Sequence, residues 1–251
     1  MMKKFGIVLF LVSLVSLLSV HTSYAQVKKN MVKKSAIAKR PPVKKTGGIK
    51  PPPVKKIPGT RVKMITDSGV IVIRLYDSTP LHRDNFVKLV EQGFYDSLLF
   101  HRLIPEFMIQ GGDPLSKYAQ QGEMLGNGGD ELSKIKPEFK PSLFHKRGVL
   151  AAARDNNPEK TSSGCQFYIV TGKKYTVTEL INMGAQMNRT FTAAEKKAYS
   201  TIGGVPWLDQ GYTVFGEVEK GIEVADKISN VPRDENNRPL TDIRMKVEIV
   251  K

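Results

Sequence analysis

FHRLIPEFMIQGGDP, residues Phe100–Pro114, is the stretch of sequence that decides the fold and points to a binding site. It places one cation, Arg102, a few residues before two large apolar side chains, Phe107 and Met108, and the amide Gln110 follows them. If the second half of the run is a strand, its period-two alternation sends Met108 and Gln110 to the same face. Such a face offers an apolar slot edged by a cation and hydrogen-bonding groups, which suits a small hydrophobic ring beside an amide.

The rest of the chain lacks the sequence patterns of hydrolytic and metal chemistry. The whole chain has four His and a single Cys, Cys165, with no HExxH or Cys/His ligand spacing and no GxSxG run. We therefore expect no metal and no cofactor. Cys165, directly before the apolar run QFYIV, is expected to be a buried small hydrophobe, and the glycine-rich run Gly126–Gly129 a flexible loop. His101 is expected to be structural, and His82 and His145 to be surface or helix residues.

The apolar patterns predict many short strands and few helices. Arg61–Tyr76 is predicted to be a hairpin that turns at Asp67–Gly69, residues typical of tight turns. A helix is expected to begin at Thr79-Pro80, with Thr79 as N-cap, and to end at Gly93; a second is expected at about 220–229. The absence of βαβ alternation favours an antiparallel, all-β barrel or sandwich. Further strands are expected at Leu98–Leu103, Phe107–Gly111, Val149–Arg154, Gln166–Val170, Tyr212–Val218 and Met245–Val250.

Two further blocks of sequence carry a family resemblance. GVLAAARDNNPEKTSSGCQFYIVTG covers Gly148–Gly172, and WLDQGYTVFGEVEKGIEVADKI covers Trp207–Ile228. Together with Phe100–Pro114, and in this order, they closely resemble the signature of the cyclophilins, the β-barrel peptidyl-prolyl cis–trans isomerases. The likeness runs from about Arg61 to Lys251. It implies a closed eight-stranded antiparallel β-barrel with a helix packed over each open end, a choice that composition alone does not make.

The resemblance also implies roles for individual residues. Arg102 matches the family's catalytic arginine, and Gln110 matches the glutamine that positions the arginine and the peptide. Ala153, Arg154 and Gln166 match the wall that binds substrate backbone in the family. Trp207 matches the aromatic residue on the edge of the groove, which is also linked in this family to cyclosporin binding. The residues that match the apolar proline pocket are Phe107, Met108, Tyr168 and Leu208.

Three substrate-binding positions depart from the common eukaryotic pattern. Tyr168 replaces the usual pocket Phe, so its hydroxyl must find a partner or water. Arg154 stands where Asn is common, and Tyr212 replaces a His near the groove. The last two leave the isomerase assignment intact but weaken the expectation of cyclosporin binding.

Residues Lys174–Pro206 form an insertion where family members usually have only a short turn. Thr176-Val-Thr-Glu179 and Thr192-Ala-Ala-Glu195 both fit the capping-box pattern of a helix start. We expect a short helical hairpin at the rim of the groove, broken at Asn188–Thr190, that influences which substrates are accepted. The alternative is a hairpin packed on the side of the barrel.

The first 60 residues are typical of an export signal followed by a spacer. Lys3–Lys4, the apolar run Phe5–Val20 and a small residue at Ala25 predict a signal peptide at residues 1–25. An uncleaved anchor is the alternative, although the run is shorter than the ~20 residues of a spanning helix. Residues 26–60 contain PPVKK twice and predict an extended, disordered Lys/Pro-rich linker. The folded domain is then residues 61–251.

The strongly basic balance of the chain comes from this leader and linker. Residues 1–60 carry 13 of the formal net charge of +15 and contain no acidic residue, so the domain is nearly neutral. A nucleic-acid partner is therefore not expected. The positive charge could attract the linker weakly to an anionic surface of the cell envelope. The alternative is that the linker is only a solubilising spacer. The single Cys excludes an intramolecular disulfide.

These features predict a secreted bacterial prolyl isomerase, monomeric and periplasmic, whose partners are proline-containing peptides and unfolded exported proteins. Release outside the cell or attachment through an uncleaved signal are the alternatives for its location. The rival function is a non-catalytic module of the cell envelope that holds proline-containing peptides in the same groove. Retention of Arg102 together with Phe107, Met108 and Gln110 favours catalysis, because binding alone does not require the arginine.

Overall fold

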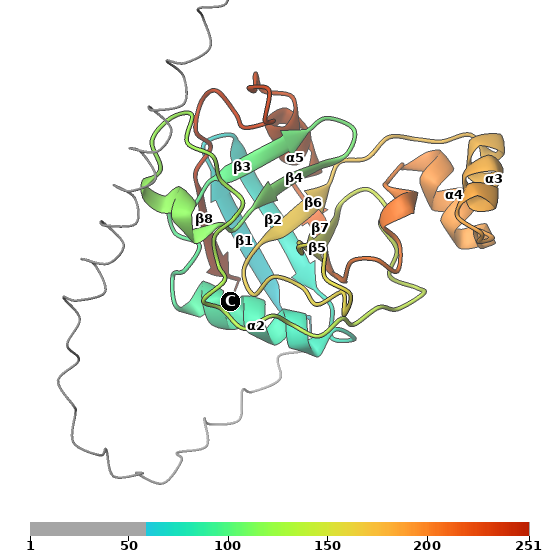
Figure 1. Cartoon of the computed structure of the whole chain (residues 1–251), viewed down its shortest axis with the longest axis horizontal. Coiled ribbons are helices and arrows are strands. Elements are labelled where there is room, and N and C mark those ends of the chain that lie inside the picture. Colours follow the sequence, from blue (N-terminus) through green and yellow to red (C-terminus); the bar gives the residue numbers. More distant parts are fainter. Residues whose placement is uncertain (1–58, 251) are drawn as a thin grey trace, which may run out of the picture. The chain divides into compact units, whose positions relative to one another are not determined.

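The structure, a computed structural model, describes residues 59–250, whose arrangement is shown in Figure 1. The predicted signal peptide and nearly all of the predicted linker lie outside these residues. The strands are β1 (Arg61–Thr66), β2 (Gly69–Leu75), β3 (Phe100–Ile104), β4 (Met108–Gly111), β5 (Val149–Ala152), β6 (Phe167–Val170), β7 (Val214–Lys220) and β8 (Met245–Ile249). The α-helices are α2 (Pro80–Glu91), α3 (Val177–Gln186), α4 (Ala193–Thr201) and α5 (Ile222–Ser229), and the 3-10 helices are η1 (Pro114–Tyr118) and η2 (Pro206–Leu208).

The eight strands form one antiparallel sheet in the order β3-β4-β6-β5-β7-β2-β1-β8. The expected antiparallel, eight-stranded fold is confirmed, but the expectation of a closed barrel is wrong, because β3 and β8 do not pair along their length. Only an isolated bridge between Leu99 and Arg244 joins their starts. The Leu103 N–H of β3 instead donates to the Asn237 carbonyl at 2.8 Å, so the loop before β8 covers this edge of a curled, open sheet.

Alternation along the strands builds the main core beneath the sheet. In β2, Ile71, Ile73 and Leu75 are fully buried, whereas Val70 is exposed. The predicted hairpin is confirmed, with β1 and β2 in register from Arg61–Arg74 to Thr66–Gly69. At the centre of this core, the Phe86 ring of α2 lies 4.9 Å from the Tyr95 ring and 5.6 Å from the Phe167 ring, measured between centroids.

Helices α2 and α5 lie at opposite ends of the sheet, as the resemblance implied (Figure 1). Thr79 occupies the N-cap position of α2, but its side chain does not cap the helix. The Glu138 carboxylate accepts from the Leu81 and His82 N–H groups at 3.1 and 3.0 Å instead. His82 itself is in the helix and buried, with its ring nitrogens 2.7 Å from Glu138 and 2.9 Å from the Ser162 hydroxyl.

The insertion is a helical hairpin, as predicted. Both capping boxes are present, at Thr176–Glu179 before α3 and at Thr192–Glu195 before α4. The hairpin has a small core of its own, formed by Tyr175, Leu180, Phe191 and Tyr199, and Phe144 from the loop before β5 packs against it. No helix within residues 59–250 is long and apolar enough to cross a membrane.

Phe86→Ala should lower the free energy of unfolding by roughly 3–5 kcal/mol, because it removes an aromatic ring from the middle of the core. Leu81→Ala is the matched control, since Leu81 lies on the same helix with a side chain that is half exposed. This control should change stability by no more than about 0.5 kcal/mol. Urea denaturation of both variants measures the difference, and equal losses would contradict the core described here.

Candidate functional site

The candidate site is organised by hydrogen bonds between side chains on three neighbouring segments. Arg102 on β3 and Gln110 on β4 are directly opposite in register, and the guanidinium donates to Gln110 Oε1 at 3.2 Å. Gln110 Nε2 donates to Gln166 Oε1 at 3.0 Å. Gln166 Nε2 in turn donates to the carbonyl oxygens of Gly126 and Gly128, each at 2.9 Å. We call this chain the amide relay.

The amide relay has one orientation. A guanidinium only donates, so it faces the oxygen of Gln110 and leaves the Gln110 nitrogen to donate onward. Two backbone carbonyls at the far end only accept, which fixes Gln166 in the same sense. Because both ends determine the direction, Arg102 is held by a side chain that cannot rotate without losing a partner.

A pocket of about 100 Å³ opens beside Arg102. A pocket of this size suits one small ring. Nine of the eleven predicted site residues line it: Arg102, Phe107, Met108, Gln110, Ala153, Arg154, Tyr168, Leu208 and Tyr212. Met108 and Gln110 share the pocket-facing side of β4, as the alternation predicted.

One wall of the pocket is aromatic and fixed from behind. The rings of Tyr168 and Tyr212 meet edge to face with centroids 5.9 Å apart. The Arg154 guanidinium lies 4.7 Å from the centre of the Tyr212 ring, and its Nε donates to the Gly211 carbonyl at 2.9 Å. Arg154 is therefore occupied in holding Tyr212 against the pocket.

The other two predicted site residues, Gln166 and Trp207, do not line the pocket. Gln166 serves the amide relay and borders a neighbouring hollow of about 380 Å³. The Trp207 ring is 46% exposed and lies 6.0 Å from the Phe107 ring, between centroids. Trp207 therefore lies next to Phe107 but outside the pocket, which fits a residue that contacts the ligand beyond the pocket.

The glycine-rich loop Gly126–Gly129 borders the larger hollow and is held by side chains at both sides. Beyond the bonds from Gln166, the buried Asp113 carboxylate accepts from the N–H groups of Gly126 and Gly128. A Cβ on Gly128 would lie 2.1 Å from Asp113 Oδ1, so a larger residue there would displace the carboxylate that holds the loop. Sequence reasoning missed this role, because nothing in the glycine pattern indicated that a carboxylate 13 residues earlier would bind it.

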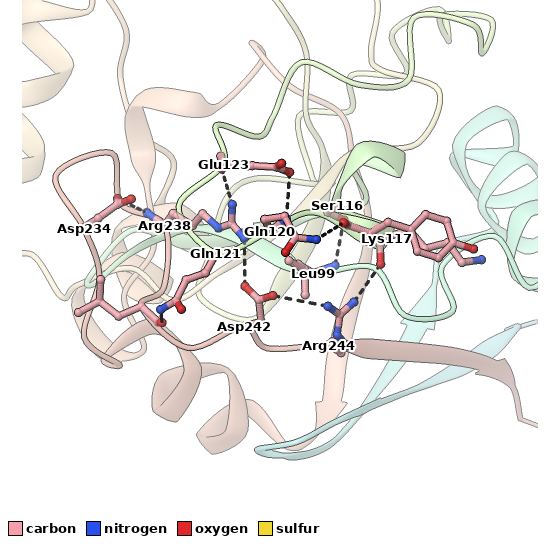
Figure 2. Close-up of polar contacts among 12 residues, drawn as sticks. Leu99, Ser116, Lys117, Gln120, Gln121, Glu123, Asp234, Arg238, Asp242 and Arg244 are labelled. Carbon is pink, nitrogen blue, oxygen red and sulfur yellow. Dashed lines mark hydrogen bonds and ion pairs between the residues drawn. The ribbon is translucent and has the colours of Figure 1, made fainter.

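Figure 2 shows how η1 and the segment after it, which leads to the glycine-rich loop, are anchored. The buried Arg238 donates to the Glu123 carbonyl and pairs with Asp242 at 3.1 Å. Arg244 donates to the Lys117 carbonyl at 3.1 Å. These two arginines fix a stretch that has little regular structure, and they thereby support the loop at the end of the amide relay.

His101, next to Arg102 on β3, is buried. Burial lowers the pKa of His101 to about 4, with the nearby Asp113 raising it and the cations Arg102 and Arg238 lowering it further. The ring is therefore neutral at pH 7 and adds no positive charge next to Arg102. This buried position of His101 agrees with the expectation that it is a structural residue.

The Tyr168 hydroxyl has found a partner inside the protein, His145, whose Nε2 lies 2.9 Å away. The expectation that His145 is a surface or helix residue is wrong: it is fully buried in the loop before β5. Burial is tolerated because its Nδ1 also has a partner, Asp209 Oδ1, at 3.0 Å. The hydroxyl of Tyr168 was the sequence signal that such a partner had to exist.

The chemistry open to this site is binding and electrostatic stabilisation. No group of three or more His, Cys, Asp or Glu within residues 59–250 could hold a metal ion. Burial raises the pKa of the Cys165 thiol to about 11, which leaves little thiolate at pH 7. What remains is a ring-sized apolar pocket with a fixed guanidinium at its edge.

Comparison with known proteins identifies relatives of the whole domain. The family described as cyclophilin type peptidyl-prolyl cis-trans isomerase/CLD matches residues 61–249. A Staphylococcus haemolyticus protein assigned as a peptidyl-prolyl cis-trans isomerase is 33% identical over 73% of this chain and 87% of its own length. A Streptococcus pyogenes protein assigned as a bifunctional phosphatase and peptidyl-prolyl cis-trans isomerase is 34% identical over 74% of this chain, which spans only 37% of that relative.

A solved structure has the same fold. The cyclophilin-type peptidyl-prolyl cis-trans isomerase of Cryptosporidium parvum is 26% identical and superposes with a TM-score of 0.58, covering 77% of this chain and 98% of its own. The same protein solved in the presence of the dipeptide Ala-Pro superposes with a TM-score of 0.54.

The burial of neutral His101 should make stability depend on pH. Between pH 6.5 and about 4 the unfolded chain binds a proton at His101 that the folded chain does not, so the free energy of unfolding should fall as the pH falls. The loss should approach the order of 3 kcal/mol at about pH 4. His101→Phe should remove this part of the pH dependence. Urea denaturation of the wild type and the variant at several pH values measures the free energy of unfolding of each. Parallel pH profiles for the two proteins would contradict the assignment.

Proposed function

The chain belongs to the cyclophilin-type peptidyl-prolyl cis–trans isomerases, and we propose that it isomerises X–Pro bonds by holding the proline ring in the 100 Å³ pocket while Arg102 stabilises the twisted amide. The observation that carries this mechanism is the position of the Arg102 guanidinium, which lies at the edge of a ring-sized pocket and is fixed by Gln110 at 3.2 Å. The isomerase activity itself is supported by the family and by its named relatives.

The reaction requires no bond to be made or broken. Resonance gives the amide a rotational barrier of ~18–20 kcal/mol, although the cis and trans forms of an X–Pro bond differ by only ~0.5–1 kcal/mol. A catalyst must therefore bind the twisted amide more tightly than either planar form. When the amide twists, the prolyl nitrogen regains a lone pair and becomes a better acceptor, so a fixed donor at that position lowers the barrier.

The residues divide this task between them. Phe107, Met108, Leu208 and the ring of Tyr168 grip the proline, and Arg102 donates to the amide as it turns. The planar fork of an arginine can serve both Gln110 and the substrate, which a lysine ammonium does less well. Ala153, Gln166 and the edge residue Trp207 contact the peptide on either side of the proline.

A non-catalytic module that holds proline-containing peptides is the second candidate. The same pocket would serve it, and the relative solved with Ala-Pro establishes only that such a dipeptide was present with that protein. The fixed guanidinium favours catalysis, because a binding pocket for an apolar ring gains little from a cation at its edge. Turnover separates the two candidates directly.

We further propose that the substrates are exported proteins, because the chain begins with a basic, then apolar, then small-residue pattern typical of a secretory signal. Uncatalysed X–Pro isomerisation is slow enough to limit the folding of a newly exported chain. The Lys/Pro-rich residues 26–60 would then attach the domain weakly to anionic envelope surfaces. Cyclosporin binding through the Trp207 edge is a lesser proposal, given Arg154 and Tyr212.

Arg102→Ala should lower kcat roughly 10²–10³-fold, because it removes a donor that acts mainly in the twisted state. Affinity for a proline-containing peptide should fall far less, since the pocket stays intact. A protease-coupled assay with an Ala-Pro tetrapeptide gives the rate, and isothermal calorimetry gives the affinity.

Arg74→Ala is a control for loss of a guanidinium, because Arg74 lies on β2, pairs with Glu217 and does not line the pocket. Its kcat should stay near that of the wild type. An equal loss of rate and affinity in Arg102→Ala would show that Arg102 is a binding residue and would favour the second candidate.

Removing residues 26–60 should leave activity on the tetrapeptide unchanged, and it should abolish salt-sensitive binding to vesicles that contain anionic lipid. The reason is that these residues hold ten Lys and one Arg without an acidic residue, and exposed charges are screened at high salt. Co-sedimentation with anionic and neutral vesicles at low and high salt measures the binding. Equal binding with and without residues 26–60 would remove the basis for envelope attachment.

A further inference from the structure

A second chain of hydrogen bonds lies behind the pocket and is separate from the amide relay. Tyr168 lines the pocket with its ring, and its hydroxyl reaches His145 Nε2 at 2.9 Å. His145 Nδ1 lies 3.0 Å from Asp209 Oδ1. A carboxylate oxygen accepts, so Nδ1 carries a hydrogen toward Asp209, and Nε2 forms the hydrogen bond with the Tyr168 hydroxyl. Burial raises the pKa of Tyr168 well above its usual value, which keeps the hydroxyl a donor.

The carboxylate at the end of this chain is held by the insertion. Tyr199 of α4 donates its hydroxyl to Asp209 Oδ2 at 2.7 Å, and Arg189, between α3 and α4, donates to the same oxygen at 3.1 Å. The other oxygen accepts from both the backbone N–H and Nδ1 of His145, at 2.7 and 3.0 Å. The Asp209 side chain is completely buried, and these four donors fill its four acceptor positions.

The insertion is itself rigid where it makes these contacts. Arg189 also pairs with Glu195, which is buried and closes the capping box of α4 through Thr192. At the neck of the insertion, Gly204 has a φ of +153° and lies so close that a Cβ would be 2.3 Å from the His145 carbonyl and 2.6 Å from the Tyr199 ring. Tyr199 and His145 thus both pack closely against Gly204, and both are hydrogen-bonded to Asp209.

Asp209 reaches the pocket by two routes. Through His145 it fixes Tyr168, which forms part of the aromatic wall with Tyr212. By chain connectivity it fixes Leu208, the preceding residue, which lines the same pocket. A change in the hold of the insertion on Asp209 therefore moves two of the groups that surround the proline ring.

We propose that the insertion is a positioning element for the proline pocket, with Tyr199 and Arg189 as positioning residues that set the affinity for the prolyl ring through Asp209, His145 and Tyr168. This rests on the proposed function, since the pocket is taken to bind proline. The ring is gripped in the cis, trans and twisted states alike. Loosening the pocket therefore weakens all three and raises KM, whereas loss of Arg102 lowers kcat.

The test is a double-mutant cycle between the insertion and the pocket, made in the full chain. Tyr199→Phe removes one donor from Asp209, and Tyr168→Phe breaks the chain of bonds while keeping the ring. Each single change should raise KM for an Ala-Pro tetrapeptide about threefold to tenfold with kcat within twofold, and the double variant should be no worse than the poorer single variant. Arg189→Lys, which keeps the charge, should lie between wild type and Tyr199→Phe.

Tyr175→Phe is the matched control. Tyr175 belongs to the insertion and is buried, but its hydroxyl has no hydrogen-bond partner within residues 59–250. Losing that hydroxyl should leave KM unchanged. Thermal unfolding of every variant identifies any general loss of stability.

The proposal is overturned if Tyr199→Phe leaves KM at the wild-type value, or if its effect adds fully to that of Tyr168→Phe. It is also overturned if Tyr175→Phe raises KM as much. Calorimetric Kd values for the same Ala-Pro peptide give the cycle an independent readout. If the wild type binds this peptide without turning it over, the mechanism proposed for Arg102 fails while the cycle in Kd still decides the role of the insertion.

Discussion

Period-two alternation in β4, β5 and β6 is the constraint on which the site depends. In β6, Phe167 and Ile169 enter the main core, while Tyr168 and Val170 face the pocket side. β4 divides in the same way, with Ile109 in the core and Met108 on the pocket side. The apolar residues that stabilise the sheet thus also fix which side chains can surround a ligand. A slip of one residue in the register would exchange the two sets and remove the site.

The Asp209 carboxylate and the His145 ring, which are buried behind the pocket, are compatible with a stable fold because their polar atoms have partners. Asp209 has four donors, and both ring nitrogens of His145 are within hydrogen-bond distance of a partner. An unpaired buried polar group costs about 1–3 kcal/mol, so the departure from an apolar pocket residue at Tyr168 requires this whole set. The same requirement makes the surroundings of Tyr168 rigid, since movement of any member leaves another without a partner.

The sequence predicted the parts of this protein that local patterns determine. Alternation located the strands within a few residues, and the capping boxes located both helices of the insertion, because each signal acts within one turn or one strand. Two expectations were wrong. The family resemblance implied a closed barrel, but the loop at Asn237 covers β3 in this chain. His145 was expected to be a surface or helix residue, but it is buried in a loop with a distant partner, Asp209. Nine of the eleven predicted site residues meet at one pocket because the family resemblance carried long-range information that the patterns lack.

The pocket is bounded by two hydrogen-bond systems that have different anchors. Arg102 is held through Gln110 and Gln166 by the glycine-rich loop, whereas Tyr168 is held through His145 and Asp209 by the insertion. In the proposed mechanism, rotation about an X–Pro bond needs both a grip on the ring and a donor at the amide. Because the two anchors are separate segments of the chain, a change in the insertion would then alter the grip on the ring while the guanidinium kept its own hydrogen bonds.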